Sequence, residues 1–252
     1  MAGLVADVRP SNLALAGAFV RAEFMKLRGS LALLLCVVAP ISVVVLNLAI
    51  SLDQDIRSFA QFASASSALW SFAMLPMAVT ALSVLLTQME HSRLAWDHAL
   101  SHEGARPFLY IAKIGTAAVL TWAMHGLLAL AMPIGWLLLR GFPGSDAWLG
   151  EFATSSVILA KMAASAMLLV ALQMGCAILF RSAIPPLCLG IVGTMAATGA
   201  VLSRQGIYFP WLFAINVMST PDRAAFVVWF GLLGGLAMFA VLSTFFSLRE
   251  RN

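Results

Sequence analysis

The clearest shortage in this sequence is charge. Only 10% of the 252 residues are Asp, Glu, Lys or Arg, whereas 62% are hydrophobic. A soluble domain carries about 25% charged and about 45–50% apolar residues. Because a charge at the centre of a bilayer costs about 2.5–3.5 kcal/mol, such a chain is expected to confine its charges to short connectors. The composition therefore predicts an integral membrane protein.

Several signatures of chemistry are also missing. Three cysteines, Cys36, Cys176 and Cys188, lie singly in apolar runs and form no disulfide framework. No lysine belongs to a G-x-x-x-x-G-K-[ST] loop, and neither H-E-x-x-H nor G-x-S-x-G occurs. These absences remove the P-loop ATPases and the commonest metalloprotease and serine-hydrolase signatures. Basic clusters interleaved with aromatics are lacking too, so nucleic-acid binding is not expected.

Long apolar runs, by contrast, occur six times. At about 1.5 Å per residue, a hydrocarbon layer of about 30 Å needs about 20 apolar residues. The fifth run is the weakest, because Gly190, Gly193 and Gly199 dilute it. The chain is therefore predicted to be an all-α integral membrane protein, one transmembrane domain over 1–252 with spans at about 31–52, 69–87, 112–138, 155–180, 184–202 and 225–247.

The basic residues of the connectors predict the orientation. Cytoplasmic connectors carry the excess of Lys and Arg. With a cytoplasmic N-terminus, the outer side holds four of these residues and the inner side ten. Both termini are therefore expected in the cytoplasm. The outer four are Arg57, Arg140, Arg204 and Arg223, and the inner ten are Arg9, Arg21, Lys26, Arg28, Arg93, Arg106, Lys113, Arg181, Arg249 and Arg251.

Residues 1–30 precede the first span, and 13–27 contain an apolar stripe at helical spacing. The stripe predicts a helix lying in the inner membrane interface, and Phe24, Lys26 and Arg28 are its candidate functional residues. A cytoplasmic extension of the first span is the alternative. The stripe consists of Leu13, Gly17, Val20, Phe24 and Leu27.

On the outer side, residues 203–224 are too apolar for a free loop and are broken by Pro210 and Pro221. Non-helical backbone at membrane depth must be sheltered by protein. We therefore expect a short re-entrant or interfacial hairpin between the fifth and sixth spans. Its aromatics, expected at headgroup depth, are Tyr208, Phe209, Trp211 and Phe213.

Polar and small residues inside the spans have two interpretations. They either line a translocation path or form hydrogen bonds between helices. Gly231 and Gly235 make a small-xxx-small pair on the last span, suited to close helix contact. Lys161 is expected to extend its amine toward the outer headgroups, with a substrate contact as the alternative. The candidate path residues are Asn47, Thr80, Ser83, Gln173 and Thr194.

The longest polar stretch, 88–107, contains three of the four histidines. His98 and His102 have the i, i+4 spacing of a metal pair, but no third ligand lies at motif spacing, so no metal site is predicted. The stretch is instead expected to present a short cytoplasmic helix whose Trp96 anchors a partner protein. Folding of Trp96 onto the bilayer surface is the alternative.

These residues resemble the membrane subunits of type-2 export ABC transporters, in particular lantibiotic-immunity and bacitracin-type permeases. Gln88, Glu90, His91, Trp96 and Leu100 follow the second span as they do in that family. "AEFMKLRGS" (22–30), "ALQMGCAILFRSAIPPLCLGIVG" (171–193) and "YFPWLFAINVM" (208–218) are similar as well. The likeness covers nearly the whole chain and consists of loose patterns.

The resemblance implies a permease that pairs with a second copy or a paralogue in the bacterial inner membrane. Each subunit would bind a separate ABC ATPase, which holds ATP and Mg, while this chain holds no cofactor. Its cargo would be a peptide, a lipid-like molecule or another amphipathic solute. The helix after the second span would dock the ATPase through Glu90, His91, Arg93, Trp96 and His98.

Two other functions remain open from the sequence. One is an intramembrane enzyme that uses the cytoplasmic His/Glu cluster with a bound metal. The other is an assembly or sensor subunit that has the permease fold without transport.

Overall fold

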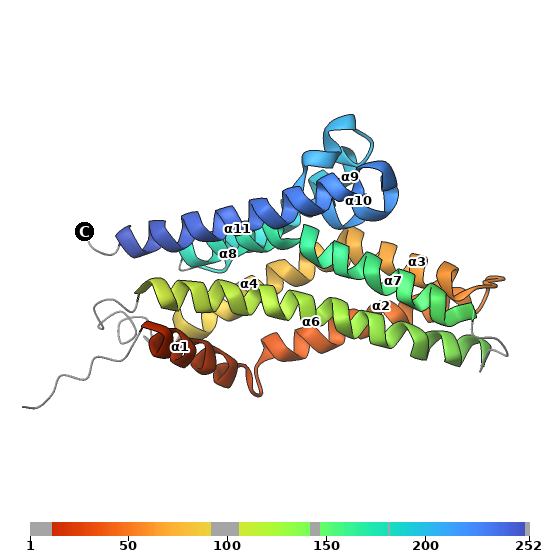
Figure 1. Ribbon diagram of the computed structural model, residues 1–252, viewed down its shortest axis with the longest axis horizontal. Coiled ribbons are helices and arrows are strands. Elements are labelled where there is room, and N and C mark those ends of the chain that lie inside the picture. Colours follow the sequence, from red (N-terminus) through yellow and green to blue (C-terminus); the bar gives the residue numbers. More distant parts are fainter. Residues whose placement is uncertain (1–11, 92–105, 142–146, 181, 250–252) are drawn as a thin grey trace, which may run out of the picture.

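The computed structural model describes residues 12–91, 106–141, 147–180 and 182–249, and within these ranges the chain is helical with no strand. The long helices run side by side along one axis (Figure 1). The helices, in chain order, are α1 (Asn12–Leu27), α2 (Leu31–Ser51), α3 (Phe59–Leu69), α4 (Leu75–His91), α6 (Arg106–Arg140), α7 (Ala147–Ser165), α8 (Met167–Leu179), α9 (Ile184–Ala200), α10 (Phe213–Ser219) and α11 (Ala224–Arg249).

Five helical stretches in the described part of the chain are long and apolar enough to cross a membrane. They confirm five of the predicted spans in existence and approximate position. The predicted fifth span is α9, which has 17 residues and a length of about 25 Å. It is shorter than the other five, so a six-span topology is not established by length. The five stretches are Leu31–Ser51, Phe59–Gln88, Phe108–Arg140, Trp148–Leu179 and Pro221–Phe246.

The second stretch begins ten residues before the predicted start at 69, because α3 continues into α4 through a π-helical turn, η1 (Trp70–Met74). The N–H of Leu75 donates to the carbonyl of Trp70, five residues back. Pro76 follows at once and has no N–H, so one carbonyl of the preceding turn loses its usual donor. A widened turn beside such a residue is a common way to accommodate that loss.

A buried polar pair fixes this turn to α6. Trp70 Nε1 donates to His125 Nε2 at 3.2 Å, and His125 Nδ1 lies 2.8 Å from the carbonyl of Thr121. The two rings meet edge to face with centroids 5.6 Å apart. A neutral imidazole can accept from Trp70 while its other N–H donates to Thr121, so both polar groups are satisfied without a charge.

A sharp joint separates α1 from the first span. Gly29 has φ +70°, a left-handed conformation that favours glycine after a helix end. Ser30 then caps α2, because its hydroxyl accepts from the N–H of Leu33 at 3.3 Å. The short sequence "RGS" therefore turns the chain from the helix that precedes the bundle into the bundle itself.

The glycines of α11 allow it to lie against the junction of α7 and α8. A Cβ on Gly231 would fall 2.1 Å from the carbonyl oxygen of Ser165, and one on Gly235 would fall 2.6 Å from the carbonyl carbon of Met167. The predicted close contact of this small-xxx-small pair is confirmed, and it occurs within one subunit.

The segment after α9 folds into short helical turns, η2 (Arg204–Tyr208), η3 (Pro210–Leu212), α10 and η4 (Pro221–Arg223). Trp211 and Phe213 are buried, so two of the four aromatics expected at headgroup depth pack against protein. The Trp211 ring fills the space beside Gly193 of α9, where a Cβ would come within 2.2 Å of it. Of the four aromatics, Tyr208 is exposed, with 57% of its surface accessible.

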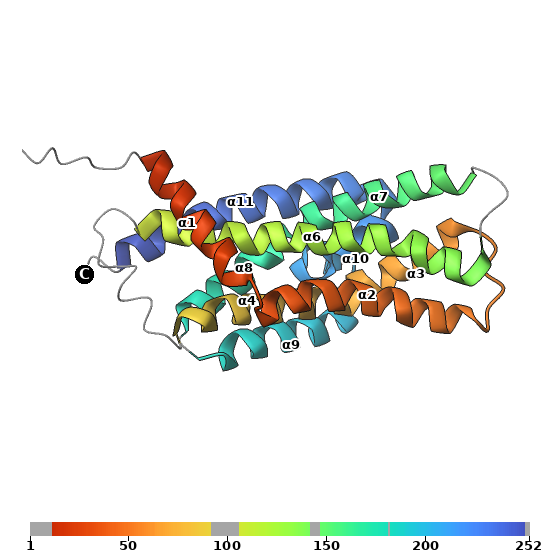
Figure 2. The same cartoon turned by 90° about the horizontal axis from the view of Figure 1, so that it is seen from below.

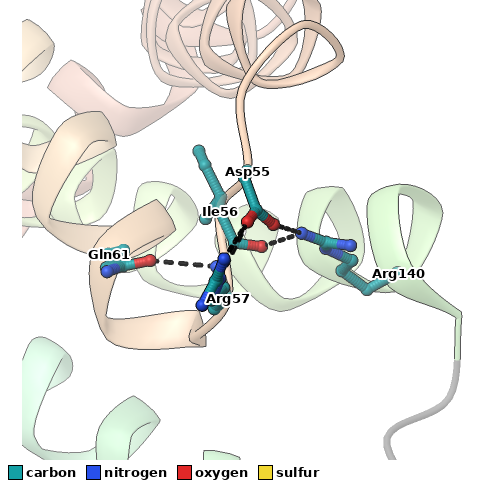
Figure 3. Close-up of polar contacts among 5 residues, drawn as sticks. All are labelled: Asp55, Ile56, Arg57, Gln61 and Arg140. Atoms are coloured by element: carbon teal, nitrogen blue, oxygen red, sulfur yellow. Dashed lines mark hydrogen bonds and ion pairs between the residues drawn. The ribbon is translucent and has the colours of Figure 1, made fainter.

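At the end of the bundle opposite α1, Asp55 joins the α2–α3 connector to α6 (Figure 3). Arg57 Nε donates to Asp55 Oδ2 at 2.8 Å, and an Arg140 amine lies 3.4 Å from Oδ1 while also donating to the carbonyl of Ile56. The hydrogen bond from Arg57, with help from Arg140, holds the pKa of Asp55 below its usual value.

Because this pKa is lowered in the folded state, the stabilisation from Asp55 exists above the unfolded-state pKa of about 3.9 and disappears as pH falls through the folded value. Asp55→Asn is expected to lower the thermal midpoint at pH 7 by only about a degree, since the site is exposed. The difference from wild type should begin to shrink as pH falls below about 4 and should vanish only below the lowered folded-state pKa of Asp55. Asp53→Asn, in the same connector, is the control and should change nothing; a pH-independent loss in Asp55→Asn would contradict the assignment.

Candidate functional site

Four elements gather at the end of the bundle that holds α1, which we call the α1 end. They are α1, the end of α4, the start of α6 and the end of α11, and α1 lies obliquely at this end in Figure 2. Tyr110 of α6 is buried with its ring 5.3 Å from that of Phe246 of α11. The basic residues assign this end to the cytoplasm in the sequence prediction.

An ion cluster at the α1 end links three of these elements. Lys113 of α6 donates from Nζ to the carbonyl of Leu86 in α4 at 3.1 Å, and the same Nζ lies 3.6 Å from Glu23 Oε2 of α1. Lys26 donates to the other oxygen, Oε1, at 2.7 Å. The side chains of Glu23 and Lys113 are only 4% and 1% exposed. One carboxylate therefore holds two ammonium groups in a desolvated setting.

Such a cluster ties α1, α4 and α6 to one another. Separating a buried pair leaves an uncompensated charge, which costs about 3–5 kcal/mol. Lys113 binds α4 five residues before its end at His91 and stands seven residues after α6 begins at Arg106. Both ends of the 92–105 connector are thus attached to each other and to α1.

Sequence reasoning missed this cluster. Glu23 lies outside the apolar stripe predicted for the interfacial helix, and the sequence prediction counts Lys113 among the basic residues of the inner connectors. The structure shows that Glu23 and Leu27 form the buried face of α1, while Val20 and Phe24 of the apolar stripe are 42% and 41% exposed. A signal was available, because Lys113 lies inside an apolar run where a charge needs a partner.

Of the predicted interfacial residues, Phe24 and Lys26 lie on α1 and Arg28 follows its end directly. Phe24 and Arg28 are exposed, and Lys26 is 37% exposed with its amine on Glu23. An apolar ring pointing away from the bundle beside two cations suits a helix at a membrane surface. The position of α1 relative to a bilayer stays a prediction.

The predicted docking helix falls largely outside the described residues. Glu90 and His91 form the end of α4, whereas Arg93, Trp96 and His98 lie beyond it, outside the described ranges. Their role stays a prediction, as does the alternative of a His/Glu metal site. Within the described residues, no group of three His, Cys, Asp or Glu side chains could hold a metal ion.

Asn47, the first candidate path residue, joins two helices. Its amide Nδ2 donates to the carbonyl of Phe62 at 2.9 Å and lies 2.8 Å from the hydroxyl oxygen of Ser66. Asn47 is 2% exposed. The amide therefore fixes α2 against α3, which is the second of the two interpretations that the sequence left open for these residues.

The other candidates lie around α4, α8 and α9. With its amide oriented to match its neighbours, Gln173 donates to the carbonyl of Pro186 (3.3 Å), accepts from the N–H of Gly190 (3.2 Å) and lies 3.1 Å from Thr80 Oγ1. Thr80 packs where a Cβ of Gly190 would be, at 2.1 Å. Ser83 and Thr194 each donate to a carbonyl of their own helix at 2.8 Å.

The structure therefore brings Thr80 and Gln173 together at one junction of three helices, and places Asn47 at a different junction. Lys161 is exposed on α7. Extension of its amine toward headgroups stays a prediction.

Comparison with known proteins adds one finding. A family model described as an ABC-2 family transporter protein matches residues 19–197, from within α1 to within α9, and the match includes the ion cluster. No curated protein and no solved structure matches the chain.

Proposed function

Because the chain belongs to the ABC-2 family of transporter proteins, we propose that it is the permease subunit of an ATP-binding-cassette exporter. In this proposal it pairs with a second copy or a paralogue and couples to a separate ABC ATPase. It moves a peptide, a lipid-like molecule or another amphipathic solute across the bacterial cytoplasmic membrane. The absence of a P-loop from the sequence supports a division of labour in which ATP and Mg belong to the partner.

The topology in this proposal has six crossings, with α9 as the short fifth one and both termini in the cytoplasm. An α9 of about 25 Å can cross where the bilayer thins or where neighbouring protein covers its ends. The turns between α9 and α11 form the outer hairpin. Support comes from the burial of Trp211, Leu212 and Phe213 against the bundle, since backbone at that depth needs shelter.

The ion cluster of Glu23, Lys26 and Lys113 is the observation that carries the coupling mechanism. ATP-driven closure of the partner would displace the docking helix formed by Glu90, His91, Arg93, Trp96 and His98. Since Lys113 connects the elements that flank this segment with α1, a displacement of the connector would be passed to three helices at once.

A translocation path along Asn47, Thr80, Ser83, Gln173 and Thr194 is part of the proposal. In the present conformation the Gln173 amide is engaged by α4 and α9. Opening a path beside it would exchange these helix contacts for contacts with solute or water. Interhelical bonds of this kind contribute only about 0.6 kcal/mol on average, so rearrangement within a transport cycle is affordable.

Trp96→Ala tests the docking assignment. A Trp at the centre of an interface is worth at least about tenfold in affinity, so the variant is expected to lose most of the co-purifying ATPase, identified by its P-loop. Insertion into membranes should be unchanged. Trp122→Ala is the matched control, because Trp122 is a 42% exposed ring on α6. Equal ATPase recovery with Trp96→Ala and Trp122→Ala, together with intact transport, would refute the assignment.

A further inference from the structure

A cavity lies where α9 ends and α11 begins, in the half of the bundle away from α1. Its volume is about 550 Å³. The walls come from the end of α9, η2, the end of α10 and η4. The polar lining residues are Ser203, Arg204, Asn216, Ser219, Thr220 and Arg223.

The cavity walls are held in place by a chain of hydrogen bonds. Asn216, 6% exposed, donates from Nδ2 to the carbonyl of Gly206 at 3.2 Å and so joins α10 to η2. Thr220 donates from Oγ1 to the carbonyl of Asn216 at 2.7 Å. Gly206 packs on the last turn of α9, where a Cβ would fall 2.2 Å from the carbonyl oxygen of Ala200. These contacts give the cavity a defined shape.

The charge of the cavity is unbalanced. Arg204 and Arg223 come from opposite sides of the hairpin, and among the described residues neither guanidinium has an ion-pair or hydrogen-bond partner. Asp222 is adjacent in sequence but is not among the lining residues. Two cations that border one polar cavity repel each other, and an anion between them removes that repulsion.

The chemistry of the donors selects the anion. Guanidinium groups present parallel N–H donors that match phosphate oxygens, and they bind phosphate in two-point geometry. The hydroxyls of Ser203 and Ser219 border the same cavity and can add donors.

Exposed apolar side chains near the cavity favour a ligand that has an apolar portion as well as an anionic group. Leu202 and Tyr208 are next in sequence to lining residues, and with Phe226 they are 91%, 57% and 44% exposed. The rings of Tyr208 and Phe226 meet edge to face with centroids 5.9 Å apart. The cavity lies at the start of the apolar helix α11. This inference rests on the topology proposed above, in which that start lies on the outer side of the membrane. We propose that this cavity, bordered by Arg204 and Arg223, binds the phosphate of an anionic phospholipid headgroup from the outer side of the membrane.

The test uses the purified full chain and does not involve the ATPase. Short-chain phosphatidylglycerol is titrated against the protein in detergent, with bound lipid counted by native mass spectrometry and phosphatidylcholine as the zwitterionic comparison. Wild type should prefer phosphatidylglycerol, and Arg204→Gln with Arg223→Gln should weaken its binding at least about tenfold. Arg57→Gln, which removes an outer arginine that pairs with Asp55, is the matched control and should bind as wild type does.

Competition with inorganic phosphate distinguishes a site for a lipid phosphate from a site that also takes free phosphate from water. If millimolar phosphate displaces the lipid from wild type, the cavity takes phosphate from water as well; if it does not, the site requires the lipid. Unchanged phosphatidylglycerol binding in the double arginine variant would overturn the proposal. Because no ATPase takes part, that failure would leave the proposed permease function untouched, and loss of ATPase coupling would leave this site untouched.

Discussion

Replacing Lys113 by methionine is expected to lower the free energy of unfolding by about 3 kcal/mol. Methionine keeps the length of the side chain but removes the ammonium that lies 3.6 Å from Glu23 and 3.1 Å from the carbonyl of Leu86. Loss of one partner from a buried pair costs about 3–5 kcal/mol. We expect the lower end of this cost range, because Lys26 stays bonded to Glu23 at 2.7 Å and still balances its charge. Unfolding titrations in mixed detergent micelles measure the change.

Lys161→Met is the matched control for this experiment. Lys161 is an exposed lysine on α7, and its loss removes a charge from an apolar span rather than a buried partner. That variant should be as stable as wild type or slightly more stable. Equal destabilisation by the two methionine variants would show that the ion cluster contributes nothing specific.

A double-mutant cycle extends the argument to the pair itself. Glu23→Gln combined with Lys113→Met should cost less than the two single changes together, because each single change already removes the shared interaction. Additive losses would contradict a direct Glu23–Lys113 interaction. In the assembled transporter, Lys113→Met is further expected to leave ATP hydrolysis running while transport falls, if the cluster passes motion from the connector to α1.

Gly231→Ala is expected to have the second largest effect. Its Cβ would lie 2.1 Å from the carbonyl oxygen and 2.7 Å from the Cα of Ser165. Both atoms belong to the backbone, so no side chain can rotate away, and α11 must shift off the junction of α7 and α8. Overpacking of this kind costs about 1–3 kcal/mol, and we expect the upper end. The same detergent titration and the yield of folded protein measure it.

Gly234→Ala provides a control three residues away on the same helix. The atoms nearest to a Cβ there all belong to the Leu168 side chain, with Cδ2 closest at 3.4 Å, which is ordinary contact with a flexible side chain. Since alanine has a better helix propensity than glycine by about 1 kcal/mol, this variant should be neutral or more stable. If Gly231→Ala and Gly234→Ala had the same stability, the close approach of α11 would not be the feature that matters.

The spans could be predicted from composition and length, because a helix that crosses a bilayer must be apolar and about 20 residues long within one continuous segment. Runs such as 31–52 and 225–247 coincide closely with the helices found. The start of the second stretch, at Phe59, could not be predicted in this way. Its first helix, α3, contains "QFASASS", whose serines and glutamine lower the hydropathy of the segment. Packing on α2 and α7 and bonds such as Asn47 to Ser66 make that segment helical all the same.

The candidate site shows the same division. The docking role of Trp96 and its neighbours comes from local pattern and stays a prediction. The partner of Lys113 could not be predicted in this way, because Glu23 lies ninety residues away, on a helix identified as amphipathic by periodicity alone. Leu27 of the apolar stripe faces the protein together with Glu23, whereas Val20 and Phe24 of the same stripe are exposed. Periodicity identifies a helix with two faces and does not say which one meets the rest of the chain.

By itself, then, the sequence determined that this protein resides in a membrane, where most of its helices lie and that ATP is not hydrolysed through a P-loop in this chain. Tertiary structure alone decided which polar groups meet: Glu23 with Lys113, Gln173 with α9, and Arg204 with Arg223 around one cavity. The physical reason is range. Hydrophobic burial in a bilayer depends on a residue and its close neighbours in sequence, whereas a buried charge or amide depends on whatever distant segment the packing of helices brings within about 4 Å.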